Sequence, residues 1–356
     1  MLLLRKFKTY LKKTILFFGT LFAIFFSRNK NNLSFKNVII VLNKPLGIGD
    51  LVMLIPYILS IKDFFPKKEF YLATDYPEIF NIESVTWTNA NAISYEKWKN
   101  SLVILPDLNL RLNKHIFFSK YLIGYLFSNR IYSNFLRSKL GYSLSNDHYS
   151  KRIEVIMKEI GIKDIKPTYD GFSPIEANLL KFHLPKRYIC IAPVSNWITR
   201  QYSFNKLIEV INLIKDHTNI VLIGTKDEKN KFEPYLKSMN DLELINLMGS
   251  TSMQEMIMII KRAEASIAND SGPAHISTIF NQNAFIIFGC CSPESRLPSN
   301  TGPIKKVTSF SNGSNCKFYP CFNGLSEPIC QNTKKNVCLD INSKVVADRI
   351  IKTINV

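Results

Sequence analysis

The feature that most constrains the fold is a repeated alternation of short apolar runs with helix-like segments. The first run, Val38–Leu42, contains only β-branched and aliphatic residues. A strand of this kind is buried on both faces, as in a parallel sheet covered by helices. Because parallel strands need long crossover connections, the helix-like segments between the runs supply them. The alternation therefore predicts an α/β fold built on parallel sheets.

The alternation occurs in both halves of the chain, which at 356 residues is long enough for two cores. In the first half we predict strands at 38–42, 69–73 and 102–105 and helices at 51–64 and 151–160. In the second half we predict strands at 188–192, 219–223, 244–247, 266–268 and, as the last, 284–288, and helices at 204–216, 227–238, 253–263 and 273–280. The pattern predicts two Rossmann-like domains, 35–180 and 181–356, facing a central cleft. Ligands are expected at the carboxyl ends of the strands.

The net charge of +18 is concentrated in two stretches of the chain. Residues 1–49 carry nine Lys or Arg and no acid, and residues 108–146 carry six and no acid, interleaved with aromatic side chains. A basic surface suits nucleic acid or anionic lipid, but aromatic residues among the cations favour lipid. No motif for reading DNA or RNA is visible. We therefore expect an anionic membrane surface as a partner, contacted through 1–30 and 108–146, and no nucleic acid. The stretch after Pro106 is predicted to be helical and partly exposed.

Residues 1–34 are predicted to form a separate basic and apolar segment that associates with the membrane. The apolar run 15–26 would span about 18 Å as a helix, short of the ~30 Å hydrocarbon core. No small-residue cleavage site follows it. A shallow anchor and a marginal span both remain open. A buried core helix is disfavoured because the run is apolar on every face.

The seven cysteines fall into two groups. Cys190, Cys290 and Cys291 lie in or beside apolar runs and are expected to be inert core residues. The other four are close to the end of the chain: Cys316, Cys321, Cys330 and Cys338. Their spacing lacks the two-residue knuckle of most zinc sites, so metal ligands, disulfides and reduced thiols all stay open. Reduced thiols are favoured and no metal is assigned, because without a cleaved signal the cytoplasm is the default compartment.

Three loops at predicted strand ends carry chemistry suited to a nucleotide sugar. In the first, Gly47 and Gly49 would let a ligand approach the backbone, and Asp50 is expected at the helix N-cap. The third glycine of a dinucleotide-binding fingerprint is replaced by Val52, so the loop does not match that motif. Asp50 is either a simple cap or a general base toward a sugar hydroxyl.

The second loop, Pro193–Tyr202, combines hydroxyl and amide side chains with a cation. Ser195 and Asn196 precede Arg200, and a helix is predicted from Phe204. The guanidinium offers a charged fork that suits diphosphate oxygens. A solvated loop whose arginine only faces water is the alternative.

The third loop, Asn269–His275, is the most specific of the three. Pro273 opens a helix, where a missing N–H costs nothing and the free amides can face an anion. Asp270 can accept hydrogen bonds from sugar hydroxyls. His275 is either a packing residue or part of the site.

Taken together, these segments resemble glycosyltransferase family 9, the heptosyltransferase family of lipopolysaccharide assembly. The resembling strings are LGIGD at 46–50 with Pro56, WITRQY at 197–202, GTKDE at 224–228, MGSTS at 248–252 and NDSGPAH at 269–275. They occur in the family's order and extend over about 38–338. The cysteine-rich tail is also similar to that of many members, although its first gap is wider.

The resemblance implies a GT-B fold and an inverting, metal-independent transfer without a cofactor. The acceptor would be of lipopolysaccharide or lipooligosaccharide type, and the nucleotide-sugar donor could be ADP-heptose. Asp50 matches the family's proposed base, and Arg200 stands where members usually have a phosphate-contacting lysine. The other donor-binding positions implied are Ser195, Asn196, Glu228, Thr251, Asp270, Ser271, Gly272, Pro273 and His275. The implied location is the cytoplasmic face of the inner membrane.

The sequence departs from the family pattern at three positions, and two other classes of protein are alternatives to a glycosyltransferase. Gln201, Tyr202 and Ser203 replace the more usual Arg, Trp and Pro, which allows a donor other than ADP-heptose. A catalytically silent, membrane-bound nucleotide-sugar-binding protein is one alternative. An NAD-type oxidoreductase is another, but the missing glycine at Val52 argues against it.

Overall fold

The structure of the protein is a computed structural model. The structure describes residues 34–42, 47–76, 79–106, 118–124, 148, 150–165, 167–237, 244–281, 283–298, 306–322, 327–332 and 336–355. Residues 1–33 and most of 108–146, for which membrane contact is predicted, lie outside this description. Within the described ranges, no helix is both long enough and apolar enough to cross a membrane.

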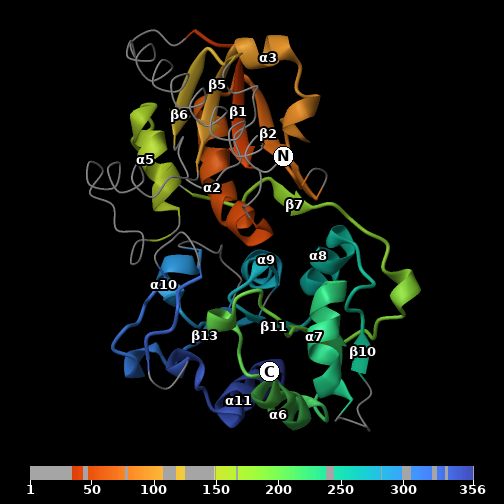
Figure 1. Cartoon of the computed structure of the whole chain (residues 1–356). Helices are drawn as coiled ribbons and strands as arrows, with labels where there is room; N and C mark the ends of the chain where they lie inside the picture. Colours follow the sequence, from red (N-terminus) through yellow and green to blue (C-terminus); the bar gives the residue numbers. More distant parts are fainter. Residues whose placement is uncertain are drawn as a thin grey trace, which may run out of the picture.

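The first half of the chain forms a five-stranded parallel sheet in the order β4-β2-β1-β5-β6 (Figure 1). Its strands are β1 Asn37–Leu42, β2 Glu69–Thr74, β4 Val85–Thr88, β5 Ser101–Leu105 and β6 Tyr121–Gly124. The apolar run of β1 lies in the middle, where Asn37 pairs with Glu69 on one side and Ser101 on the other. Every residue of β1 is buried, as its sequence predicts.

The helices of this half are α2 Ile48–Phe64, α3 Tyr95–Lys99 and α5 Lys151–Glu159. A short antiparallel pair, β3 Phe80–Ile82 with β7 Phe172–Pro174, lies outside the main sheet. Helix α2 follows β1, so its N-terminus lies at the carboxyl end of the central strand. This places the first candidate loop at the position where open α/β sheets bind ligands.

The second half forms a six-stranded parallel sheet in the order β10-β9-β8-β11-β12-β13. Its strands are β8 Tyr188–Ala192, β9 Asn219–Leu222, β10 Leu244–Asn246, β11 Ala265–Asn269, β12 Asn283–Ile287 and β13 Lys306–Phe310. Its helices are α6 Phe204–Ile214, α7 Lys226–Leu236, α8 Met253–Arg262, α9 Gly272–Phe280, α10 Pro293–Arg296 and α11 Ser343–Ile354. Numbered along this half of the chain, the six strands lie in the order 3-2-1-4-5-6 across the sheet. This is the strand order of a dinucleotide-binding Rossmann sheet.

The two halves meet through α2 and α9, which lie next to each other in the middle of Figure 1. One apolar core cluster contains residues of both helices. Phe280 at the end of α9 stacks on Phe80 and Phe172 of the first half, with ring centroids 5.9 and 5.5 Å apart. At the other end, a Cβ on Gly49 would lie 3.3 Å from Gly272 Cα, so the N-termini of α2 and α9 lie close together.

Several elements differ from the sequence prediction or were not predicted. Part of the stretch predicted to be helical after Pro106 is the edge strand β6, because pairing with β5 outweighs its local preference. The remainder of that stretch lies outside the described residues. Strand β12 is not the last strand, because β13 follows it and pairs with it. Helix α11, which packs against α6, was also not predicted. The sequence of β13, KVTSF, mixes polar and apolar residues as a partly exposed edge strand does, so it lacks the continuous apolar pattern.

Candidate active site

A cavity of about 670 Å³ opens between the two halves. Its volume is in the range of sites that bind small molecules and cofactors. Every candidate catalytic, donor-binding and cleft-loop residue lines it: Gly47, Gly49, Asp50, Ser195, Asn196, Arg200, Glu228, Thr251, Asp270, Ser271, Gly272, Pro273 and His275. The structure thus brings all three candidate loops to one place.

Asp50 reaches the cavity from the first turn of α2. The prediction that it is the N-cap is wrong, because the helix begins at Ile48 and Gly47 is the N-cap. Asp50 is the third helical residue, and its Oδ2 accepts a hydrogen bond from the Gly47 N–H at 3.2 Å. This contact, together with the positive end of the helix dipole, holds a carboxylate at the cavity edge.

The turn between β11 and α9 is fixed by the last residue of the strand. The side chain of Asn269 accepts a hydrogen bond from Tyr202 N–H (2.9 Å) and donates one to the Pro193 carbonyl (3.0 Å). These bonds tie the second candidate loop to the third. Pro273 lies in the first turn of α9, as predicted, so the first amides of that helix can face a ligand.

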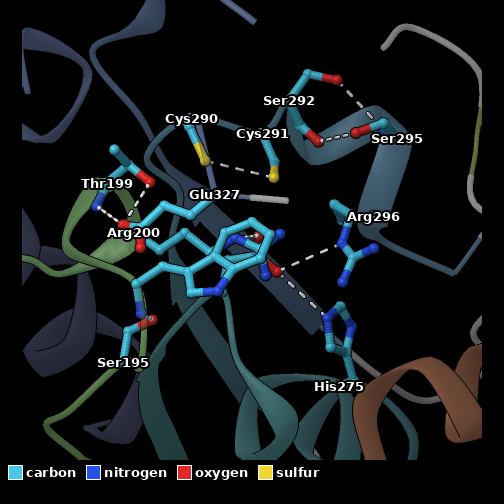
Figure 2. Close-up of polar contacts among 12 residues, drawn as sticks. Ser195, Thr199, Arg200, His275, Cys290, Cys291, Ser292, Ser295, Arg296 and Glu327 are labelled. Carbon is cyan, nitrogen blue, oxygen red and sulfur yellow. Dashed lines mark hydrogen bonds and ion pairs between the residues drawn. The ribbon is translucent and has the colours of Figure 1, made fainter. Parts of the chain in front are cut away.

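Asp270 lies at the centre of a buried polar cluster, whose other members Arg200, Arg296 and His275 are labelled in Figure 2. It is 1% exposed, and its carboxylate oxygens lie 3.3 Å from Arg200 Nε and 3.7 Å from Arg296 Nε. His275 Nε2 is also 3.3 Å from Asp270 Oδ1. Burial by itself raises the pKa of Asp270, but the two guanidinium groups outweigh it and hold that pKa well below its usual range. Asp270 is therefore ionised throughout the physiological range.

His275 is buried and also lines the cavity. Burial lowers its pKa, and the nearby Arg296 lowers it further, whereas Asp270 opposes the shift. The imidazole is accordingly neutral at neutral pH. It lines the cavity and packs so closely on α2 that a Cβ on Gly49 would lie 2.5 Å from its Cδ2.

Arg200 does not face water as the alternative interpretation of its loop supposed. Its side chain is 11% exposed, and its guanidinium stacks 4.0 Å from the ring centroid of Trp197 and 5.2 Å from that of Phe322. The same guanidinium pairs with Asp270. Close packing of Gly289 against Thr199 fixes the backbone of this segment, because a Cβ there would collide with the Thr199 carbonyl oxygen. Arg200 is thus a rigidly held cation in the cavity wall.

The far end of the cavity is formed by the loops after β9 and β10. Glu228 lies in the first turn of α7 and accepts the Thr225 N–H at 2.7 Å, in a capping box. The loop containing Thr251 passes close to this turn, because a Cβ on Gly249 would lie 3.0 Å from the Lys226 backbone. Gly249 has a φ of 76°, which glycine adopts without strain, and this makes the close approach possible.

Several residues of the cavity wall were not predicted from the sequence. Arg296 lies at the end of α10, after β12, and Tyr76 lies after β2; both line the cavity. Each follows a parallel strand, so the rule that placed the three loops at strand ends also covers these positions. Arg296 and Tyr76 stand in short segments without a recognisable motif, so no sequence signal pointed to them.

The cysteines have partners that the sequence did not indicate. Cys290 and Cys291 are buried, as predicted, with their sulfurs 3.8 Å apart. A hydrogen bond with Cys291, and the Arg200 charge, lower the pKa of Cys290 to about 7 against the effect of burial. The four cysteines of the tail line a small cavity beside Cys290, and none of the seven is disulfide-bonded. The described residues contain no group of three or more His, Cys, Asp or Glu side chains arranged to hold a metal ion.

Comparison with known proteins identifies the family. The family model for glycosyltransferase family 9 (heptosyltransferase) matches residues 142–326, more than half of the chain. Lipooligosaccharide heptosyltransferase 2 of Campylobacter jejuni is 22% identical over 270 residues, covering 70% of this chain and 81% of that protein. The lipopolysaccharide core heptosyltransferase OpsX of Haemophilus influenzae is 20% identical over 280 residues, with coverages of 71% and 80%.

Solved structures agree with this fold over nearly the whole chain. A glycosyltransferase family 9 protein of Veillonella parvula superimposes with a TM-score of 0.65 at 12% identity, covering 91% of this chain and 98% of that one. ADP-heptose lps heptosyltransferase II of E. coli gives a TM-score of 0.59 at 14% identity, with coverages of 90% and 98%. The two-sheet architecture is the GT-B fold that the motifs implied. With its fold and more than half of its sequence matching in this way, the chain belongs to glycosyltransferase family 9, the heptosyltransferases.

Proposed function

We propose that this protein is an inverting glycosyltransferase that moves heptose or a related sugar from a nucleoside-diphosphate donor to a lipopolysaccharide- or lipooligosaccharide-type acceptor. Family membership and the names of the relatives from C. jejuni and H. influenzae support the class of reaction. The observation that carries the proposal is the placement of Asp50 from one half and a buried cationic cluster from the other on one cavity.

The donor diphosphate would bind at the second half. Arg200 places a buried guanidinium in the wall of the cavity, held there by its ion pair with Asp270. The N-terminus of α9 adds free amides. Ser271 Oγ is buried and has no hydrogen-bond partner in the part of the chain that the structure describes, so it is available to the donor. These fixed charges would stabilise the diphosphate as it leaves, without a divalent cation.

The nucleoside would extend from the diphosphate toward α7. Glu228 and Thr251 line that end of the cavity, and Ser195 and Asn196 line the wall beside Arg200. A carboxylate suits the two ribose hydroxyls, which are hydrogen-bond donors. ADP-heptose is one donor that this arrangement would accommodate.

Asp50 would act as the general base. Its carboxylate takes the proton of the acceptor hydroxyl as the hydroxyl oxygen forms a bond to the anomeric carbon. The bond from that carbon to the diphosphate oxygen breaks on the opposite face, and the nucleoside diphosphate leaves with the electron pair. Attack opposite to the leaving group inverts the anomeric centre, as in inverting glycosidases.

The acceptor would be reached at a membrane surface. The basic and apolar residues 1–30 and the basic, aromatic stretch 108–146 support peripheral association with anionic lipid. The corresponding location is the cytoplasmic face of the inner membrane, where a glycolipid acceptor could enter the cavity.

The test is an Asp50→Asn variant assayed with a panel of nucleotide sugars and glycolipid extracts, with products identified by mass spectrometry. Loss of the base should lower the transfer rate by roughly 10²–10⁴-fold. Donor affinity, measured by calorimetry, should be retained because Asp50 is on the acceptor side. Asp63→Asn is the matched control, because this carboxylate lies on the same helix but is exposed, and its variant should be as active as the parent.

Two results would contradict the proposal. Transfer by Asp50→Asn at the parental rate would exclude Asp50 as the base. Binding of a nucleoside diphosphate by the parental protein without transfer to any acceptor would instead indicate a silent binding protein.

A further inference from the structure

Arg296 is a buried cation that connects the two halves of the molecule. Its side chain is 7% exposed although arginine is among the residues least often buried. The guanidinium extends from α10 in the second half to Asp50 in the first, with Nη2 3.3 Å from Oδ1. Its Nε lies 3.7 Å from Asp270 Oδ1. One side chain therefore contacts the carboxylates on both sides of the cavity.

The backbone that carries Arg296 is fixed at both ends of α10. Ser292 caps the helix by accepting the Ser295 N–H at 3.2 Å, and the Ser295 hydroxyl donates to the Ser292 carbonyl at 2.8 Å (Figure 2). The Leu297 carbonyl, directly after Arg296, accepts a hydrogen bond from His148 Nε2 of the first half at 2.6 Å. The position of the guanidinium is thus set by contacts with both halves.

These contacts determine where the carboxylate of Asp50 is held. Gly47 N–H binds Oδ2 and Arg296 binds Oδ1, so the carboxylate is oriented by one contact from its own helix and one from across the cavity. A carboxylate oxygen has two lone pairs, so each remains able to accept a proton from an incoming hydroxyl. A short side chain held at both oxygens has little freedom to turn away.

We propose that Arg296 is the positioning residue of the transfer reaction. It holds the carboxylate of Asp50 in a fixed position relative to the donor-binding turn at Asp270. This inference rests on the proposed function, because it takes Asp50 to be the base. Arginine suits the task since its planar fork can contact two carboxylates at once, whereas the ammonium of lysine is a point charge. Arg296 acts through Asp50 and is distinct from a cation whose role is to bind the diphosphate.

The test is a double-mutant cycle with Asp50→Asn, Arg296→Gln and the combined variant, each assayed for kcat under single-turnover conditions and for donor Kd by calorimetry. In the parental background, Arg296→Gln should lower kcat by about 10²-fold, the usual cost of misplacing a catalytic group by about 1 Å. Donor Kd should change little. In the Asp50→Asn background the same substitution should lower kcat by no more than about twofold, because the group that it positions is already lost.

Two further variants separate positioning from folding. Arg296→Lys keeps the charge without the fork and should recover part of the kcat lost in Arg296→Gln, so it also serves if the glutamine variant does not fold. Arg187→Gln is the control, because Arg187 forms an ion pair with Glu264 at 2.6 Å but its side chain is 70% exposed. It should leave kcat at the parental value.

The following results would contradict the positioning role of Arg296 or the need for its planar fork. If the losses in the cycle multiply, or if Arg296→Gln weakens donor binding as much as it lowers kcat, Arg296 does not act through Asp50. A lysine variant with the full parental kcat would show that a point charge is enough to hold Asp50 and that the planar fork is not needed. If Asp50→Asn alone leaves kcat unchanged, the assignment of the base fails, and the positioning role fails with it.

Discussion

The charge cluster around Asp270 gives a quantitative prediction about stability. Asp270→Asn preserves the shape of the side chain but removes the negative charge that faces Arg200 at 3.3 Å and Arg296 at 3.7 Å. Both guanidinium groups are buried, so neither can recover its hydration. Removing one partner of a buried ion pair costs about 3–5 kcal/mol. For a half of this size, that corresponds to a fall in Tm of roughly 6–20 °C.

The pH dependence of this effect follows from the direction of the pKa shift. The pKa of Asp270 is lower in the folded protein than in the unfolded chain. Its contribution to stability is therefore complete above the unfolded value of about 3.9 and is lost as the pH falls from there toward the folded value. The difference in stability between the parent and Asp270→Asn should be constant through the neutral range and should narrow only at more acidic pH.

Thermal unfolding followed by circular dichroism at several pH values measures both effects. Asp348→Asn is the control, since that carboxylate is exposed on α11 and its loss should change stability by no more than about 0.5 kcal/mol. An Asp270→Asn variant that melts within a degree of the parent would refute the reasoning. So would a stability difference that changes steeply around neutral pH.

Two glycines make close approaches that a single methyl group would test. Gly289→Ala places a Cβ against the Thr199 carbonyl oxygen, so it should cost about 1–3 kcal/mol and weaken donor binding in calorimetry. Gly49→Ala places a Cβ 2.5 Å from His275 Cδ2, where the halves meet, and should lower kcat with a similar loss of stability. Parental Tm and kinetics in either variant would mean that the backbone there is not confined.

The errors of the sequence analysis share a physical cause. Asp50 was placed at the N-cap because carboxylates favour that position, whereas a glycine occupies it and the carboxylate returns from the first turn to accept its N–H. The stretch containing β6 was expected to be helical, but an available sheet edge at β5 decided its structure. Local preference amounts to a few tenths of a kcal/mol per residue, and tertiary pairing overrides it.

The sequence by itself determined the alternation of buried strands and helices, and hence the two parallel sheets, because continuous apolar runs are stable only when both faces are covered. It also located the three loops that reach the cavity, since parallel strands bring their carboxyl ends to one edge. Only the tertiary structure decided what those loops contact. Arg296 pairs with Asp50 across 246 positions of the chain. No local pattern encodes such a pair, because the energy of a buried charge depends on which groups the fold places around it.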